Sequence, residues 1–263
     1  MKRLLLSAAV MSLLLTSASN ASAQLKLNKK AIGAVDKGVK AATFSDADAA
    51  KLAGEAIAYM DTHNEVAAAD DPYMVRLTKL FSKHQNEGGL KLNFKVYKVK
   101  DINAFACADG SVRVFSSLMD IMTDEELLGI IGHEIGHVAN KDTRDAIRDA
   151  YKTAALTDAA ASQSGAVNSL SESQLGGFCT ALLGTKFSRK QESEADDYSY
   201  NFMKQHGYNV TALASAFNKF AEMEKEAGDN RSKSEKMLSS HPESADRAAK
   251  VLEKAKKDGL AKL

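Results

Sequence analysis

TDEELLGIIGHEIGHVAN, residues 123–140, is the most informative segment of this chain. Thr123 and Glu126 form a capping-box pattern, which is typical of the start of a helix. Large aliphatic residues then recur at helical spacing, at Leu127, Ile130, Ile131, Ile135 and Val138. The segment is therefore predicted to form a mostly buried helix.

His133 and His137 stand four residues apart in this helix, and Glu134 follows the first of them. Residues at this spacing share one helix face, so the two imidazoles can bind one metal ion from the same side. Glu134 would then lie close to the open position of the metal. The alternative is a pair of ordinary histidines on an apolar helix, but H-E-x-x-H in a buried helix favours a zinc site.

Gly132 and Gly136 lie within the same helix, where each costs roughly 1 kcal/mol relative to alanine. We therefore expect another backbone, a substrate or the metal to approach the helix closely at these positions.

The composition is that of a folded protein with little net charge. Of 263 residues 44% are hydrophobic, enough for a core in one large domain or two small ones. Lys and Arg number 35 and Asp and Glu 34, so the overall charge does not point to nucleic acid or to an anionic membrane surface. With only two prolines, the chain is expected to be mainly helical.

The N-terminus resembles a secretory signal peptide. Lys2 and Arg3 precede an apolar run over 4–15, and Ala-Ser-Ala at 21–23 offers a cleavage site. The run is too short to span a bilayer, although an uncleaved anchor is the alternative, and no later stretch approaches the roughly 20 apolar residues required. We expect an exported protein, periplasmic or secreted, without stable membrane insertion. The expected organisation is a signal peptide at 1–23, a tail at 24–43 and one zinc-binding domain at 44–263.

After export, Cys107 and Cys179 would be in an oxidising compartment. A disulfide between them would close a long loop and stabilise the fold by about 4 kcal/mol on the chain-entropy model. Two small buried thiols fit their apolar neighbours equally well.

Short β-type segments precede the histidine helix. Residues 91–99, 103–107 and 111–116 are predicted strands of a small antiparallel sheet, with two amphipathic helices at 45–68 and 71–86 before them. An exposed edge of such a sheet could accept an extended peptide as an added strand.

Predicted helices also follow the histidine motif, at 141–160, 178–204, 209–227 and 243–258. Residues 161–177 are rich in Ser, Gly and Ala, and are expected to be either a plain linker or a lid over the site. His63, His84 and His206 are interpreted as surface or helix-end histidines without a special role.

Glu192 and Asp196 stand four residues apart in the predicted helix 178–204, whereas Glu194 is displaced by about 200° from Glu192. Only one of the two glutamates can therefore face the metal. A run of charges is usually a solvated helix face. However, a site with two histidines needs a third protein ligand, and a carboxylate from another helix is one solution.

Three motifs together resemble the HtpX-like and prenyl-protease-like zinc metallopeptidases, metallopeptidase family 48 of the gluzincin clan. These are H-E-I-G-H at 133–137, E-S-E-A-D at 192–196 and H-P-E-S-A-D-R at 241–247. N-A-F-x-x-x-x-G at 103–110 is similar to the family pattern as well. Because the chain lacks the transmembrane helices of the membrane-bound branches, it is more similar to the soluble periplasmic branch.

The resemblance implies an α+β fold, a mainly helical zincin-type domain with a small antiparallel β-sheet beside the H-E-x-x-H helix. It implies that His133, His137 and Glu192 bind one zinc ion per chain and that Asp196 orients one histidine. It also places the segment with His241 and Arg247 near the cleft. His241 could stabilise the oxyanion or contact substrate, could be a fourth zinc ligand that keeps the enzyme latent, or could have no catalytic part.

The expected function is that of a zinc-dependent endopeptidase acting on extended or unfolded segments of exported proteins, in envelope protein quality control. Zinc with three protein ligands lowers the pKa of a bound water to about 7, and Glu134 is the expected general base. His241 and Arg247 are the candidates for stabilising the oxyanion or for binding substrate. The alternatives are a latent or non-catalytic zinc-containing chaperone or interaction protein, and a zinc hydrolase acting on something other than peptides.

Overall fold

The computed structural model describes residues 44–87, 89–155, 169–227 and 240–261. The predicted signal peptide and tail lie outside these residues, as do residues 161–168 of the segment predicted to be a linker or lid. All the described helices and strands belong to one compact unit, residues 45–161 and 168–263.

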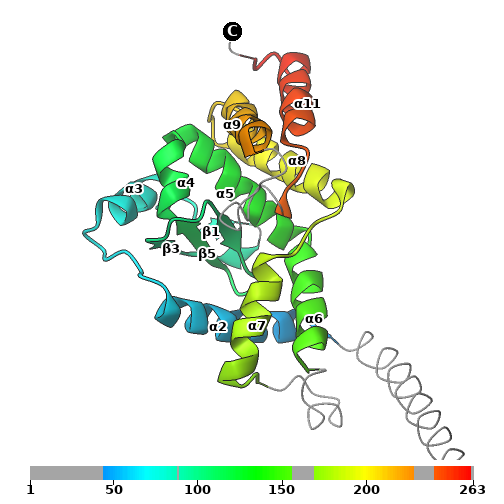
Figure 1. Cartoon of the computed structure of the whole chain (residues 1–263). Coiled ribbons are helices and arrows are strands. Elements are labelled where there is room, and N and C mark those ends of the chain that lie inside the picture. The colour runs from blue at the N-terminus through cyan, green and yellow to red at the C-terminus, as the bar shows by residue number, and fades with distance from the viewer. Residues whose placement is uncertain (1–43, 88, 156–168, 228–239, 262–263) are drawn as a thin grey trace, which may run out of the picture. The chain divides into compact units, whose positions relative to one another are not determined.

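The described residues form a mainly helical α+β fold, as predicted (Figure 1). Its helices are α2 (Asp46–His63), α3 (Pro72–Phe81), α4 (Ser116–Ile121), α5 (Asp124–Ala139), α6 (Asp142–Ala155), α7 (Glu172–Leu183), α8 (Arg189–Gln205), α9 (Thr211–Ala227) and α11 (Ser244–Lys257). Its strands are β1 (Asn86–Glu87), β2 (Leu90–Lys91), β3 (Asn93–Tyr97), β4 (Ala104–Ala106) and β5 (Ser111–Phe115). No helix among the described residues is both long enough and apolar enough to cross a membrane.

The main sheet is mixed, with the strand order β3-β5-β4. β4 and β5 pair antiparallel, as predicted, but β3 and β5 run parallel, and β1 and β2 form a separate antiparallel pair. The hairpin turns at Gly110, whose φ is 86° and where a Cβ would lie 2.3 Å from the Lys91 carbonyl oxygen. β5 lies between β3 and β4 and runs parallel to β3, so the prediction of a purely antiparallel sheet was wrong for β3.

β5 is buried along its whole length, including the charged residue Arg113. The guanidinium forms an ion pair with Asp61 of α2, with Nε 2.9 Å from Oδ1. Burial raises the pKa of Asp61, but hydrogen bonds from Arg113, Lys95 and Tyr97 outweigh it and lower the pKa to about 2. The ion pair thus supplies the partner that a buried charge requires in a central strand.

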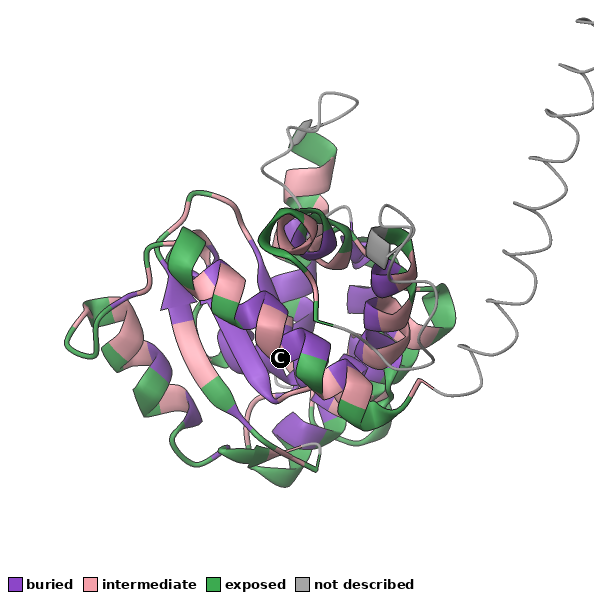
Figure 2. Cartoon of the chain, turned by 90° about the horizontal axis from the view of Figure 1, so that it is seen from below, coloured by how far each residue is buried: buried purple, intermediate pink, exposed green. Residues whose placement is uncertain are grey.

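α5 is the central helix of the fold. Its capping box forms as predicted, with Thr123 Oγ1 accepting from the Glu126 backbone and Glu126 Oε2 accepting from the Thr123 backbone. The helix packs against β4 on one side and against α8 and α9 on others. Figure 2 shows buried positions concentrated along the strands and the helices that cover them. α5 is buried from Glu126 to His137, as predicted for a core helix.

The glycines of α5 allow α8 to approach closely, which confirms the expected crowding. A Cβ on Gly132 would lie 3.1 Å from Ser199 Oγ and from a ring carbon of Phe202. A Cβ on Gly136 would lie 3.0 Å from the carbonyl oxygen of Ala195. The neighbour is thus the backbone and side chains of α8, the helix that carries Glu192.

We expect Gly136→Ala to destabilise the fold by about 1–3 kcal/mol, because the added methyl group meets the α8 backbone, which cannot yield as a flexible side chain can. This overpacking outweighs the gain of roughly 1 kcal/mol in helix propensity. Urea unfolding measures the change. Gly177→Ala is the matched control, because a methyl group added to Gly177 of α7 would meet nothing within 4 Å, and it should be neutral or stabilising. If Gly136→Ala and Gly177→Ala stabilised the protein equally, α8 would not approach α5 closely at Gly136.

The predicted helix 178–204 is in fact two helices, α7 and α8, and α7 begins inside the predicted linker. Gly184 ends α7, and Ser188 begins α8 with a capping box to Gln191. The caps at Gly184 and Ser188 were therefore the local signal for this break. α4 was not predicted, because six residues are too few to show a periodicity.

Both cysteines are free and buried in the structure, in agreement with the thiol alternative. Burial raises the pKa of both thiols, that of Cys179 to about 11. Neither thiol is therefore set up as a nucleophile.

Candidate metal centre

Two helices meet at the candidate metal centre. α5 carries His133, Glu134 and His137, and α8 carries Glu192 and Asp196 one turn apart on its buried face. Glu194 of α8 is about half exposed, and its carboxylate lies 3.6 Å from the Lys190 ammonium. Of the two neighbouring glutamates, Glu192 is thus the one that lies among the histidines.

The donor atoms have separations that suit zinc. His133 Nε2 and His137 Nε2 are 3.1 Å apart, and each lies 3.6 Å from an oxygen of Glu192. Zinc binds such atoms at about 2.0–2.2 Å, so the ligand atoms of a tetrahedral site are about 3.3 Å apart. Two imidazole nitrogens that face each other at this distance fit a shared cation, and the residues present therefore fit zinc.

A carboxylate orients each histidine through its other nitrogen. His133 Nδ1 is 2.9 Å from Asp196 Oδ1, and His137 Nδ1 is 2.9 Å from Asp142 Oδ2. In each ring Nδ1–H can donate to the carboxylate, which leaves the Nε2 lone pair for a metal. The Gln191 side-chain amide donates to the other oxygen of Asp142 at 2.9 Å.

Asp142 was not among the residues that the sequence pattern singled out. It is buried and begins α6, five residues after His137. Lys141 before it has a φ of 66°, so the chain turns back toward the histidine at this point. The signal available in the sequence was an acidic residue directly after the helix break that follows H-E-x-x-H.

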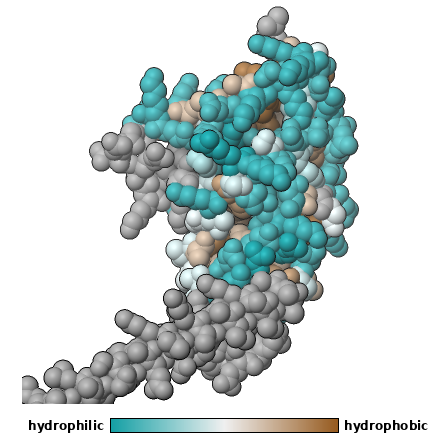
Figure 3. All heavy atoms as spheres, turned by 90° about the vertical axis from the view of Figure 1, so that its right-hand side faces the viewer, coloured by the Kyte–Doolittle hydropathy of each residue, from teal (hydrophilic) through white to brown (hydrophobic). Residues whose placement is uncertain are grey.

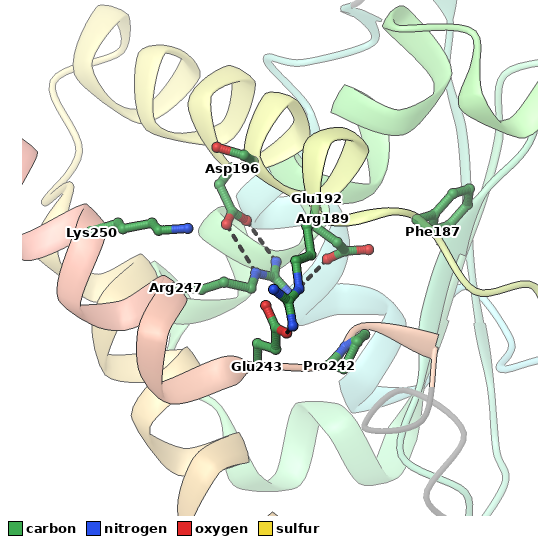
Figure 4. A pocket seen from close by; sticks show the side chains of 9 residues that line it. Phe187, Arg189, Glu192, Asp196, Pro242, Glu243, Arg247 and Lys250 are labelled. Atoms are coloured by element: carbon green, nitrogen blue, oxygen red, sulfur yellow. Dashed lines mark hydrogen bonds and ion pairs between the residues drawn. The ribbon is translucent and has the colours of Figure 1, made fainter.

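Arg247 of α11 points toward Asp196 and Glu192 of α8 (Figure 4). Its guanidinium donates two hydrogen bonds to Asp196, at 2.6 and 2.9 Å, and Nη1 is 2.7 Å from Glu192 Oε2. It also stacks over the Phe217 ring at 4.1 Å from the centroid. Arg247 thus contacts the carboxylates of both Glu192 and Asp196. This differs from the expected contact with substrate or oxyanion.

His241 lies within the group of donor atoms. Its Nδ1 is 3.2 Å from His133 Nε2 and 2.9 Å from Glu192 Oε1, and the side chain is buried. Its Nε2 is 3.8 Å from Glu134 Oε1. This arrangement places four protein donors around one point, so it fits the fourth-ligand hypothesis more closely than an oxyanion contact.

Burial and charge set the protonation of these side chains. Burial lowers the pKa of His133 to about 3, with the Arg247 charge acting in the same direction. Burial also lowers that of His137, but the carboxylates of Asp142 and Glu192 outweigh it and raise the pKa to about 9. Burial raises the pKa of Glu192, yet hydrogen bonds from His137 and His241 outweigh it and lower the pKa far below its usual range. The surroundings of His137 thus favour its protonated form, and those of Glu192 favour its ionised form. Both shifts mean that a positive charge is favoured between these two side chains.

Glu134 borders a cleft on the other side of the histidines. Its Oε1 is buried and has no hydrogen-bond partner among the described residues, and burial raises its pKa. The walls of the cleft come from β4, α6, the end of α7 and the His241 loop. They are formed by Asn103, Ala104, Phe105, Ala106, Cys107, Glu134, Thr143, Ala146, Leu182, Leu183, Thr185, Phe187, Ser240 and His241.

β4 presents its outer edge to this cleft. Cys107 N–H donates to Ser111 and Phe115 N–H donates to Asn103 in the pairing with β5. Because hydrogen-bonded positions alternate in an antiparallel pair, the backbone groups of Ala104 and Ala106 point away from β5. One wall of the cleft is therefore a strand edge that pairs with no other strand of the described residues.

Known proteins resemble this chain over most of its length. Residues 74–255 match the model of peptidase family M48. Metalloprotease LoiP of Escherichia coli strain K12 is 42% identical over 222 residues, which are 84% of this chain and 86% of LoiP. Metalloprotease YcaL of the same strain is 39% identical over 213 residues, 81% and 82% of the two chains.

A more distant relative is the putative beta-barrel assembly-enhancing protease of Vibrio cholerae. It is 24% identical over 231 residues, which are 84% of this chain but 47% of that protein. The family match and the two closer relatives agree with a buried histidine and glutamate cluster that fits zinc. The chain therefore belongs to peptidase family M48 and is a zinc-dependent metalloendopeptidase.

Proposed function

We propose that the chain is an exported endopeptidase that cleaves extended segments of envelope proteins, with zinc held by His133, His137 and Glu192. The observation that carries this proposal is the buried Oε1 of Glu134, which has no hydrogen-bond partner among the described residues and lies beside the outer edge of β4. A general base and a surface that accepts an extended backbone thus border the same cleft.

The proposed mechanism uses Glu134 as the proton carrier. Bound zinc would supply a Lewis acid that polarises the peptide carbonyl and increases the acidity of the attacking water. Glu134 accepts the proton of that water and passes it to the departing amine. Asp196 and Asp142 hold the two imidazoles in the tautomer that keeps Nε2 free for the metal, and Arg247 acts as a positioning residue for Glu192 and Asp196.

The substrate is proposed to bind as an added strand on β4. Ala104 and Ala106 would pair with the peptide backbone, and their small side chains leave the scissile bond close to Glu134. Recognition through the backbone requires an extended segment, which unfolded or misassembled proteins offer. Tightly folded substrates should therefore be poor ones.

Export and a role in envelope quality control rest on the N-terminal pattern of residues 1–23 and on the relatives. One relative is named a putative beta-barrel assembly-enhancing protease. The face of the molecule seen in Figure 3 is mostly hydrophilic, with only scattered apolar areas, as suits a protein working in water.

We further propose that His241 is a latch: its imidazole would be a fourth ligand of bound zinc in the resting enzyme and would have to move away for catalysis. His241→Ala should then raise the rate of casein cleavage several-fold, with zinc content unchanged. Loss of activity would instead assign oxyanion stabilisation to His241, and an unchanged rate would remove both roles. Rates at saturating zinc should be used, so that weaker metal binding does not imitate a loss of catalysis.

The experiment that tests the function is cleavage of unfolded casein by the purified protein, before and after removal of zinc by a chelator. We expect cleavage that stops on chelation and returns with zinc, and little cleavage of a compact folded protein. Zinc binding without cleavage, in the wild type and in His241→Ala alike, would favour the non-catalytic zinc-containing chaperone or interaction protein instead.

A further inference from the structure

A second histidine cluster lies away from the catalytic cleft. His84 follows α3, Glu87 belongs to β1 and His206 caps the end of α8. His84 is only 1% exposed, which corrects its interpretation as a surface histidine. Together with the catalytic group, this cluster accounts for five of the six histidines of the chain.

The two imidazoles converge on one carboxylate oxygen. Glu87 Oε1 lies 3.1 Å from His84 Nδ1 and 3.2 Å from His206 Nε2. The two rings meet edge to face with centroids 4.4 Å apart. These separations are close to the 3.1–3.6 Å that separate the donors of the catalytic site, and to the roughly 3.3 Å expected of ligands around zinc.

The second nitrogen of His84 is fixed by another partner. Nε2 lies 2.7 Å from the Tyr208 hydroxyl, and Phe202 packs against the ring edge to face. If Nε2–H donates to Tyr208, the Nδ1 lone pair points toward Glu87, which is how a ligating histidine is normally held. The buried ring is thus oriented by groups that are not themselves part of the donor set.

We propose that His84, Glu87 and His206 form a second binding site for a divalent transition metal such as Zn²⁺. Two imidazoles and one carboxylate form a donor set that zinc accepts. The His206 side chain is 36% exposed and that of Glu87 20%, so an ion can enter from solvent and keep water as a further ligand.

The site would join the end of α8 to β1. The same helix carries Glu192 and Asp196 nearer its start, so a metal at its other end would restrain the helix that supplies the third catalytic ligand. The expected effect is a more stable protein in the presence of zinc, with the chemical step itself unchanged.

The test is the zinc content of protein without a polyhistidine tag, dialysed against about 1 µM free zinc. The wild type should hold about two ions per chain and His206→Ala about one. The increase in Tm that zinc produces should also be about 5 °C smaller in the variant. His206→Ala changes an exposed side chain and should fold, whereas His84→Gln, in a buried position, serves as the second variant.

His63→Ala is the matched control. His63 lies at the end of α2, stacks on Tyr59 and belongs to neither cluster, so this variant should retain about two ions. Equal zinc content in wild type and His206→Ala, or an equal loss in His63→Ala, would overturn the proposal. Casein cleavage by His206→Ala should match the wild type. If neither the wild type nor the variants cleaved casein, the proposed function would fail. The difference in zinc content between wild type and His206→Ala would still test the second metal site.

Discussion

Glu134→Gln should reduce kcat/KM for casein by about 10²–10⁴-fold while zinc content and fold stay unchanged. The amide has nearly the shape of the carboxylate but cannot accept the proton of the attacking water. Because Glu134 lies beside the donor group rather than within it, the substitution leaves the proposed ligands His133, His137 and Glu192 unchanged. Initial rates, metal analysis and circular dichroism on the same preparation measure the three quantities.

Glu194→Gln is the control for this substitution. It makes the same chemical change on an exposed glutamate of α8, and it should retain full activity. If Glu134→Gln cleaved casein at the wild-type rate, Glu134 would not be the base, and the unpartnered oxygen at the cleft would need another explanation.

Arg247→Met should lower the free energy of unfolding of the zinc-free protein by about 3–5 kcal/mol. The substitution leaves the buried carboxylates of Glu192 and Asp196 without their shared cation, and an uncompensated buried charge costs about this much. Zinc affinity should also fall, by about 10–100-fold, because groups that hold metal ligands in place have effects of this size. Urea unfolding in chelator and competition with a zinc indicator measure the two effects.

Two control substitutions separate charge from geometry. Arg247→Lys keeps the charge but loses the bidentate hydrogen bonding to Asp196. Its loss of unfolding free energy should therefore be intermediate. Arg148→Met removes a partly exposed arginine of α6 that pairs with the partly exposed Asp145, and should cost at most about 1 kcal/mol. A loss for Arg247→Met no larger than that for Arg148→Met would show that Arg247 does not support the ligand carboxylates.

Acid should weaken the same contacts. Burial raises the pKa of Asp196, but hydrogen bonds from His133 and Arg247 outweigh it and lower the pKa to about 2. A carboxylate with a lowered pKa stabilises the fold above its unfolded pKa of about 3.9 and loses this contribution as the pH falls through about 2. In Arg247→Met the pKa of Asp196 should be higher, so its stabilising contribution should disappear at a higher pH.

Local sequence was sufficient for the elements that carry the site. The capping box at Thr123 and the aliphatic periodicity predicted α5, and four-residue spacing put His133 and His137 on one face. The same spacing argument separated Glu192 from Glu194. These features depend on contacts within one or two helical turns, and such contacts can be calculated from helix geometry alone.

What the sequence could not show depends on contacts between distant segments. The parallel pairing of β3 with β5 is one example. A parallel and an antiparallel pairing both fit the alternation of apolar and polar residues in β3, so the sequence pattern could not distinguish them. The contact of Arg247 with Asp196, 51 residues away in the chain, follows from how α11 packs.

The sequence by itself therefore determined the catalytic helix, the residue types of its metal site and the family. Only the tertiary structure decided which further side chains complete the sites. Asp142 reaches His137 through a turn with positive φ, and His84 meets His206 although the two are far apart in the chain. The physical reason is that helix periodicity is a local property, whereas the approach of two side chains depends on the packing of the whole core.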